Sequence, residues 1–469
     1  MKQENIGLHR KQVNPFLLVL LSFVILIVIG SGLLFLDLVL NGKNIDPTIN
    51  LSFETYLDCF FVAVSASCVT GLNPFTGGIV GTFSLFGQIV VACLMQIGGL
   101  GFITVLAFLI TLFAGKIRFK DRYWLSQAVG STSFIHVIKF VRQIILISFI
   151  VETIGFGLFI PAMINLYPNN IGYGLWVSLF HSISSFNNAG FDLLGNTSLI
   201  ASEGSLLANA PSWIPIYIQI ITMVLIITGG LSFLTIIEVF SFKKKPAQYR
   251  PFTKIVLLST VGLLVCGSIL FVAFECFKST NPMTPLDAIF QSVTCRTAGF
   301  STYDQSQLTI GSQIVSCFLM FIGGAPLGTA GGIKITTFFI MILSMYSYLK
   351  GREVSAFHRK YSQKQIIRAM CLIFFSVFVI IISFAAIEIF EGGVFSAENI
   401  IFEVFSAFGT VGVTANLTTE LSIGSKLVLC FLMYIGRLGP MTMFSVFSKN
   451  INAESKLHYE LVEEDLLIG

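Results

Sequence analysis

The stretch that decides the fold reads Ala63-Val64-Ser65-Ala66-Ser67-Cys68-Val69-Thr70-Gly71-Leu72. A similar stretch occurs three more times along the chain, and in each copy an apolar residue follows a glycine. A pattern that recurs in this way predicts four copies of one structural unit. The other copies read Ser182-Ile183-Ser184-Ser185-Phe186-Asn187-Asn188-Ala189-Gly190-Phe191, Ser292-Val293-Thr294-Cys295-Arg296-Thr297-Ala298-Gly299-Phe300 and Phe405-Ser406-Ala407-Phe408-Gly409-Thr410-Val411-Gly412-Val413.

The composition indicates a membrane protein. Of the 469 residues, 55% are hydrophobic and 11% are charged, whereas soluble globular proteins carry about 25% charged residues. Several apolar runs reach the length of about 20 residues that crosses a bilayer. The first of these runs, residues 15–40, is longer than the core of a signal peptide, and we interpret it as a retained span. The nine cysteines are scattered singly, which excludes a disulfide framework and a zinc site.

Each unit is predicted to contain a leading span, a half-span too short to cross the membrane, a turn, and a trailing span. The trailing spans share a second mark, which is a glycine pair or its Gly-Arg variant: Gly98-Gly99, Gly229-Gly230, Gly323-Gly324 and Gly436-Arg437. In the order leading span, half-span and trailing span, the segments are residues 15–40, 53–67 and 82–114 in the first unit and 138–166, 173–186 and 213–241 in the second. They are residues 254–277, 285–295 and 313–349 in the third unit and 366–390, 397–408 and 425–447 in the fourth. The units themselves are residues 1–122, 123–250, 251–360 and 361–469.

The four turns have the properties of an ion filter. Irregular backbone at membrane depth is tolerated only where it is buried in protein or lines a cavity. Four turns around one axis would present a ring of carbonyl oxygens, which is how potassium channels replace the hydration shell of the ion. Ordinary turns are the alternative for any single copy, but four copies in one context favour a filter. The predicted potassium-binding residues are Val69, Thr70, Gly71, Asn188, Ala189, Gly190, Thr297, Ala298, Gly299, Thr410, Val411 and Gly412.

The half-spans carry helix-start signals. Thr284 and Ser396 are predicted N-caps of the third and fourth half-spans, and Pro285 occupies a favoured first helical position. Asp287 and Glu398 lie in the first turns. A helix that enters from outside directs its partially negative C-terminal end at the turn, which favours a cation there. We therefore predict an all-α polytopic membrane protein in which four M1–P–M2 (helix–pore loop–helix) units surround one central ion pore, as in potassium channels.

Basic residues predict the orientation. Clusters of lysine and arginine follow the first three units, within residues 116–122, 243–254 and 350–368, whereas the opposite loops hold few. By the positive-inside rule, both termini and the linkers between units are cytoplasmic and the turns open outward. A docking surface for a cytosolic partner or an anionic lipid is a second interpretation of these clusters.

The third trailing segment contains a predicted gate. Residues 323–332 hold five glycines and one proline, so they cannot form a stable helix. We expect a broken helix whose loop obstructs the pore below the turns and swings aside, with Arg437 as a positive barrier. The alternative is a packing kink in which Lys334 reaches the cytoplasmic face, whereas a phosphate-binding loop is excluded because Gly-Lys-Ser/Thr is absent. The predicted gate residues are Gly323, Gly324, Gly328, Thr329, Gly331, Gly332, Lys334 and Arg437.

Other ionisable residues receive supporting roles. We expect His181, Glu403 and Arg296 to support the turns through hydrogen bonds. Asp192 and Asp304 follow two of the turns and could concentrate cations at the pore mouth, with solvated loop residues as an equal alternative. We expect Glu152, Glu238 and Glu388 to lie near helix ends or to be paired.

On these motifs the chain resembles the Trk, Ktr and HKT superfamily of potassium transporters, most closely the bacterial Ktr-type membrane subunit, over nearly its whole length. The motifs that carry the resemblance lie at residues 68–72, 186–191, 296–300, 323–334, 408–412 and 436–440. The resemblance implies potassium uptake at the plasma membrane, often sodium-dependent, by a homodimer with a separate cytosolic nucleotide-binding regulatory ring. It also implies that the loop and Arg437 form the gate, and that no covalent cofactor and no nucleic acid are bound.

Two alternatives to potassium uptake remain. A sodium-preferring transporter of the same superfamily is the closer one; in the relatives a serine at the position of Gly71 accompanies sodium permeation, so this glycine favours potassium. A polytopic membrane enzyme would need a convergent catalytic cluster. The five histidines show no such spacing, so we predict that the protein is not an enzyme.

Overall fold

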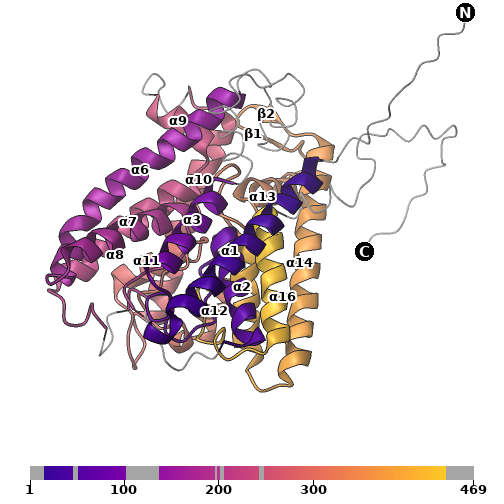
Figure 1. Cartoon of the computed structure of the whole chain (residues 1–469). Coiled ribbons are helices and arrows are strands. Elements are labelled where there is room, and N and C mark those ends of the chain that lie inside the picture. Colours follow the sequence, from indigo (N-terminus) through magenta and orange to yellow (C-terminus); the bar gives the residue numbers. More distant parts are fainter. Residues whose placement is uncertain are drawn as a thin grey trace, which may run out of the picture.

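The protein is a bundle of long and short helices (Figure 1). The computed structural model describes residues 15–45, 51–101, 137–195, 198–200, 205–241 and 248–439. The first unit comprises α1 (Pro15–Ile45), α2 (Phe53–Cys68) and α3 (Leu85–Leu100); the second comprises α6 (Val137–Leu166), α7 (Ile171–Asn187), α8 (Trp213–Gly230) and α9 (Phe233–Phe240). The third comprises α10 (Pro251–Glu275), α11 (Pro285–Thr294), a 3-10 turn η2 (Gln305–Gln307), α12 (Ile310–Phe321) and α13 (Ile335–Leu349); the fourth comprises α14 (Gln363–Glu391), α15 (Ala397–Gly409) and α16 (Ile423–Leu438).

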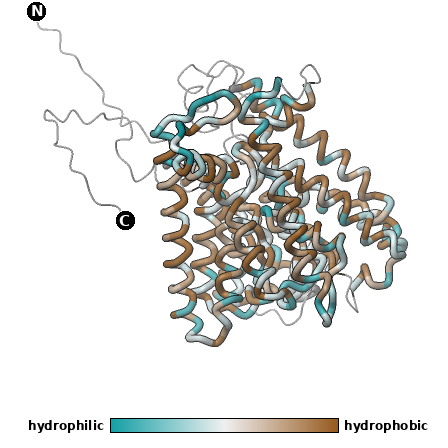
Figure 2. Tube along the Cα trace, turned by 180° about the vertical axis from the view of Figure 1, so that it is seen from behind, coloured by the Kyte–Doolittle hydropathy of each residue, from teal (hydrophilic) through white to brown (hydrophobic). Residues whose placement is uncertain are grey.

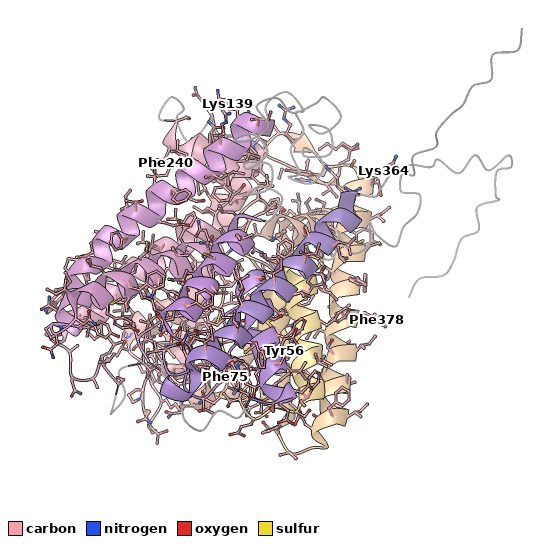
Figure 3. All side chains as sticks on the ribbon, in the orientation of Figure 1. Tyr56, Phe75, Lys139, Phe240, Lys364 and Phe378 are labelled. Atoms are coloured by element: carbon pink, nitrogen blue, oxygen red, sulfur yellow. The ribbon has the colours of Figure 1, made fainter. Side chains whose placement is uncertain are left out.

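The long helices have the length and composition of membrane spans. Among the described helices, α1, α6, α8, α10 and α14 are long and apolar enough to cross a membrane. Figure 2 shows hydrophobic helix bodies and hydrophilic segments gathered at the two ends of the bundle. Figure 3 places Lys139 and Lys364 at one end and Tyr56 and Phe75 toward the other, while Phe378 points outward from α14. The short β-hairpin of β1 (Ser355–Ala356) and β2 (Arg359–Lys360) lies between α13 and α14 in the chain.

The four units close into a ring. The trailing helix of each unit packs on the short helix of the next unit: α3 on α7, α8 on α11, and α12 on α15. The trailing helix α16 of the fourth unit returns to α2 of the first. In Figure 1 the second unit (α6, α7, α8) accordingly lies on the side of the bundle opposite the fourth (α14, α16). The predicted architecture of four helix–pore loop–helix units around one centre is confirmed.

The trailing segments differ from the prediction in one respect. The break predicted in the third unit is present, since α12 ends at Phe321 and α13 begins at Ile335. A second break, which the prediction of one helix over 213–241 missed, separates α8 from α9 at Leu231 and Ser232. There the N–H of Phe233 donates to the carbonyl of Leu327, at 3.1 Å, so a loop from the third unit replaces the intrahelical partner. Residues 102–114 and 440–447 of the other two predicted trailing segments lie outside the described residues.

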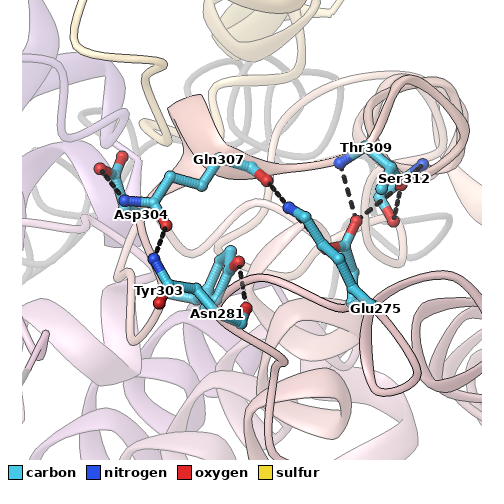
Figure 4. Close-up of polar contacts among 8 residues, drawn as sticks. Glu275, Asn281, Tyr303, Asp304, Gln307, Thr309 and Ser312 are labelled. Carbon is cyan, nitrogen blue, oxygen red and sulfur yellow. Dashed lines mark hydrogen bonds and ion pairs between the residues drawn. The ribbon is translucent and has the colours of Figure 1, made fainter.

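A carboxylate joins the leading and trailing helices in three of the units. The Asp37 carboxylate accepts from the N–H of Ser84 at 2.9 Å in the first unit. Glu275 accepts from the N–H of Thr309 at 2.8 Å in the third, a contact drawn in Figure 4, and Glu391 accepts from Ser422 at 3.0 Å in the fourth. Each acceptor lies at the N-terminus of a trailing helix, where backbone N–H groups lack helical partners. The contact therefore joins the end of the leading helix to the start of the trailing helix in each of these units.

Candidate functional site

The four turns that follow the short helices share one backbone conformation. We call residues 69–71, 188–190, 297–299 and 410–412 the filter turns. Each begins with a left-handed residue, a conformation that non-glycine residues seldom adopt: Val69 (φ 58°), Asn188 (φ 59°), Thr297 (φ 72°) and Thr410 (φ 50°). Each ends with a glycine of positive φ, between 72° and 105°. Since α2, α7, α11 and α15 all end at or just before their turn, their partially negative C-terminal ends point at it.

Hydrogen bonds of the Schellman type close three of the turns. The N–H of Thr70 donates to Ser65 O, that of Ala189 to Ser184 O and that of Val411 to Ser406 O, each at 2.8 Å. This is the bond that commonly ends a helix at a left-handed residue. In the third unit, where Val293 replaces the serine, the N–H of Ala298 instead donates to Thr294 O at 3.0 Å.

The serine side chains explain why hydroxylic residues recur six positions before the glycine. The Gly71 N–H donates to Ser65 Oγ at 3.0 Å, and the Gly412 N–H donates to Ser406 Oγ at 3.1 Å. The Ser184 hydroxyl, at the same place in the second unit, has no partner among the described residues. Where the serine binds, the N–H of the glycine is satisfied inside the protein.

The four glycines meet in a closed ring. A methyl group built on Gly71 would lie 2.7 Å from Ala189 O, and one on Gly190 would lie 2.9 Å from Ala298 O. One on Gly299 would lie 2.6 Å from Val411 O, and one on Gly412 would lie 1.8 Å from Thr70 O, which returns to the first unit. Each glycine therefore faces the carbonyl of the equivalent residue in the next unit. Only a residue without a Cβ permits backbones to approach this closely.

A cavity of about 720 Å³ lies against this ring. All four filter glycines line it, together with Asp192, Asp304 and several asparagine, glutamine and threonine residues. Asp192 and Asp304 therefore do lie just beyond the filter turns, as the sequence indicated. Burial raises the pKa of the Asp192 carboxyl to about 6, although the N–H of Leu194 donates to it at 3.0 Å. This carboxyl is negative at neutral pH and becomes neutral on mild acidification.

The glycine pairs let the trailing helices approach the short helices. A methyl group on Gly98 would lie 2.1 Å from Ser67 O, and one on Gly229 would lie 1.8 Å from Phe186 O. One on Gly436 would lie 2.0 Å from Phe408 O. These carbonyls belong to the last turns of the short helices. In three units the first glycine of the pair therefore lets the trailing helix pack against the base of the filter turn. In the third unit Gly323 instead lies against Gly331 O of its own loop.

Residues 323–334, which we call the glycine-rich loop, cross from the third unit to its neighbours. The N–H groups of Ala325 and Thr329 donate to Gly230 O and Gly229 O, both at 3.1 Å. On the other side, the N–H of Gly332 donates to Gly436 O at 3.2 Å. The hydroxyl of Thr329 donates to Phe186 O at 3.3 Å, at the base of the second filter turn. The loop thus joins the glycine pairs of the second and fourth units.

Two basic residues contact this loop. Arg437 donates to Thr329 O in the loop and to Gly98 O and Gly99 O in the first unit, the last at 2.9 Å. Lys334 donates to Ala330 O at 2.7 Å, so its ammonium group folds back onto the loop. The structure therefore brings together all the residues predicted for the gate. Their action as a gate stays a prediction.

The ionisable residues that were expected to support the turns, and the expected helix caps, agree with the structure only in part. Arg296 does tie the third short helix by hydrogen bonds, to Thr260 O at 3.4 Å and Gly323 O at 3.3 Å. Glu403 accepts from Thr418, beyond the fourth filter turn. His181 bonds Thr222 on α8 at 3.0 Å rather than a filter turn. The expected cap at Ser396 is wrong in its side-chain contact: Ser396 precedes α15 but makes no capping hydrogen bond, whereas Thr284 accepts from the N–H of Asp287 at 3.2 Å.

Glu152 does not lie at a helix end. It is in the middle of α6, 5% exposed, and accepts hydrogen bonds from side-chain amides of two other helices. Sequence reasoning also missed the Asp37, Glu275 and Glu391 contacts, although a carboxylate near the end of a leading helix and a Ser or Thr before a trailing helix recur in three units.

Comparisons with known proteins relate this chain to cation transporters. Residues 36–459 match the family described as TrkH, cation transport protein. The chain is 35% identical to the potassium/sodium uptake protein NtpJ of Enterococcus hirae, with 98% of each chain covered. It is 34% identical to the Ktr system potassium uptake protein B of Bacillus subtilis, with 94% of each covered. Its fold is similar to that of the potassium transporter TrkH from Vibrio parahaemolyticus, with a TM-score of 0.67 at 18% identity, covering 94% of this chain and 86% of that one.

Proposed function

The chain belongs to the TrkH family of cation transport proteins, and from this premise we propose that it takes up potassium across the plasma membrane through the ring of filter turns. The chain is accordingly a membrane transporter and not an enzyme. The observation that carries the proposal is the closed ring, in which the carbonyls of Thr70, Ala189, Ala298 and Val411 each meet a glycine of a neighbouring unit.

The ring has the chemistry that a dehydrated potassium ion requires. Carbonyl oxygens replace the water around the ion, and a selective path needs several of them at fixed positions. The left-handed residues Val69, Asn188, Thr297 and Thr410 set those positions, and the C-terminal ends of four helices add negative potential. We assign ion binding to these residues and to the two that follow each of them.

Selection of potassium over sodium is supported by Gly71. A serine at this position would place its Cβ about 2.7 Å from Ala189 O, which would distort the ring. The relative from Bacillus subtilis is named for potassium uptake, whereas that from Enterococcus hirae is named for potassium and sodium. A sodium-preferring transporter is therefore the second candidate, with the same ring as its path.

We propose that the glycine-rich loop and Arg437 form the gate. The residues are Gly323, Gly324, Gly328, Thr329, Gly331, Gly332, Lys334 and Arg437. Their contacts join the second, fourth and first units directly beneath the filter turns, where a loop closes the ion path. The arginine and lysine add positive charge that opposes a cation there.

The basic residues support a proposed orientation and a proposed docking surface. Lys139, Lys364 and the hairpin residues Arg359 and Lys360 lie at one end of the bundle (Figures 1 and 3), and by the positive-inside rule this end is cytoplasmic. The cavity at the filter turns then faces outward. We propose that a cytosolic nucleotide-binding subunit docks at the basic end of a homodimer, and that sodium acts as a coupling or activating ion.

Uptake of potassium and rubidium in a potassium-uptake-deficient bacterium tests this function. The chain is expressed alone and with a candidate cytosolic nucleotide-binding subunit, each with and without sodium. Growth at low potassium together with rubidium uptake is the expected result. If the chain is in the membrane and no combination takes up either ion, while sodium enters, the sodium-preferring alternative holds instead.

A further inference from the structure

The proposed path leaves the role of a buried carboxyl group in the described part of the chain, that of Glu152, unexplained. Glu152 lies in the middle of α6, is 5% exposed, and forms no ion pair with any lysine or arginine in the described part of the chain. A carboxylate inside a membrane span is costly unless strong partners satisfy it. The role of Glu152 therefore depends on the groups that it contacts.

Two amide side chains from two other helices bind this carboxylate. Gln96 Nε2, on α3 of the first unit, donates to both Glu152 oxygens, at 2.9 and 3.1 Å. Asn187 Nδ2, on the last residue of α7, donates to Glu152 Oε1 at 3.3 Å and to Gln96 Oε1 at 2.9 Å. The three side chains therefore form a closed triangle between two units. We call Gln96, Glu152 and Asn187 the carboxylate–amide triangle.

Both amide residues adjoin functional backbone. Asn187 immediately precedes Asn188, the left-handed residue of the second filter turn. Gln96 lies two residues before Gly98, whose carbonyl accepts from Arg437. The Oδ1 of Asn187 would lie 1.9 Å from a methyl group on Gly99, so the glycine pair of the first unit makes room for this side chain. The triangle thus stands between the filter turn of one unit and the Arg437 contact of another.

A cation site is a poorer description of the triangle. The amide groups present N–H donors to the carboxylate, whereas a metal ion or sodium needs their oxygen atoms. The donors instead match a negatively charged acceptor, and bonds to such an acceptor are stronger than bonds to a neutral one.

We propose that Glu152 is a positioning residue for ion selection, which holds Asn187 and Gln96 so that the second filter turn keeps its place in the ring. This inference rests on the proposed function, because selection is measured by uptake. Without the carboxylate, Asn187 loses its link to α6, and the backbone of Asn188, Ala189 and Gly190 is free to shift away from Gly71 and Gly299.

An exchange of partners gives the sharpest test. Glu152→Gln removes the charge and sets amide N–H groups against one another. The double variant Gln96→Glu/Glu152→Gln restores one carboxylate and one amide, and Asn187 Nδ2 already contacts both positions, so its bonds are kept. Glu388→Gln, which changes a carboxyl group on the leading helix α14 of another unit, is the matched control.

The readouts are the KM for rubidium uptake and its inhibition by sodium, with each variant quantified in the membrane. We expect Glu152→Gln to raise the KM for rubidium about tenfold, as for the loss of one hydrogen bond to a charged group. The variant should also lower the preference for rubidium over sodium. The double variant should return to within about twofold of the wild type, and Glu388→Gln should match the wild type.

Three results would overturn the inference. One is an unchanged KM and sodium sensitivity in Glu152→Gln; another is a double variant no better than this single one. If Glu152→Gln does not reach the membrane, Glu152→Asp decides: its shorter side chain should raise KM, and an unchanged KM contradicts the inference. If the wild type itself takes up no ion, the proposed function is wrong. If the wild type is active and the variants behave like it, only the inference about Glu152 is wrong.

Discussion

The filter turns and the glycine-rich loop lie next to each other but are built in opposite ways. The filter turns are four copies of one conformation, each fixed by a left-handed residue and a glycine without room for a Cβ. Among the described residues the glycine-rich loop occurs only in the third unit, and hydrogen bonds to the glycine pairs of other units hold it. The four repeated turns thus form the proposed ion path, and the loop that is not repeated is the proposed gate.

The difference in construction predicts a difference in sensitivity. Steric fit at the filter glycines leaves no alternative arrangement, whereas a hydrogen bond of the loop contributes only about 1 kcal/mol net. Changes at the filter glycines should therefore abolish transport or its selectivity, and changes at the loop contacts should alter the rate of flux.

The largest effect is expected from Gly412→Ala. Its Cβ would lie 1.8 Å from Thr70 O on a backbone of φ 90°, so both strain and a clash oppose the native ring. We expect rubidium uptake to fall about a hundredfold or more. Gly157→Ala is the matched control, because nothing lies within 4 Å of that helical glycine; comparable loss in both variants would refute the steric account.

Arg437→Ala should have the next largest effect, in the opposite direction. The change removes the bonds to Thr329 O and Gly99 O and the positive charge beneath the ring. Resting rubidium flux in the absence of the cytosolic subunit should rise about tenfold, as for one charge-assisted bond. Arg437→Lys keeps the charge and should give a smaller rise. Unaltered or lower flux at equal membrane content would exclude a gate role.

A smaller effect is expected where a side chain supports the ring. Ser65→Ala and Ser406→Ala each remove the acceptor of a filter glycine N–H. Each should lower the preference for potassium over sodium about fivefold, the effect of about 1 kcal/mol. Ser184→Ala provides the comparison, since its hydroxyl has no partner among the described residues. Equal effects in all three variants would show that the glycine amides do not depend on these serines.

The smallest effect concerns the cavity outside the ring. With its pKa raised to about 6, Asp192 is charged above that pH and neutral below it, so acidification should weaken the attraction for cations. The KM for rubidium should rise about two- to threefold between about pH 7.5 and about pH 5. Asp192→Asn should keep the higher KM at both pH values. A variant with the pH dependence of the wild type would assign the titration to another group.

The sequence predicted the repeated parts of the fold well, for a physical reason. A span, a half-span, a turn and a glycine pair each leave a local signal, and four copies reinforce it. The short helices α2, α7, α11 and α15 begin and end within a few residues of their predicted positions. The break in the third trailing helix was also visible, because five glycines and a proline oppose a helix.

The missed features depend on contacts between distant segments. At the break between α8 and α9, the carbonyl of Leu327 from another unit accepts from the N–H of Phe233. The contact between Glu152 and Gln96 joins two units, and no local pattern in either segment indicates the other. Ser65 and Ser406 each lie six residues before a filter glycine in the sequence, but their hydrogen-bond partners are evident only from the geometry of the turns.

The ratio of rubidium to sodium uptake in Gly71→Ser, compared with the wild type in the same membranes, tests most directly the claim that the ring of four filter turns selects potassium. The wild type should prefer rubidium, and the serine, placed where a Cβ lies 2.7 Å from Ala189 O, should lower that preference while uptake persists. An unchanged ratio in Gly71→Ser, or a wild type with no preference over sodium, would contradict the assignment of selectivity to this ring.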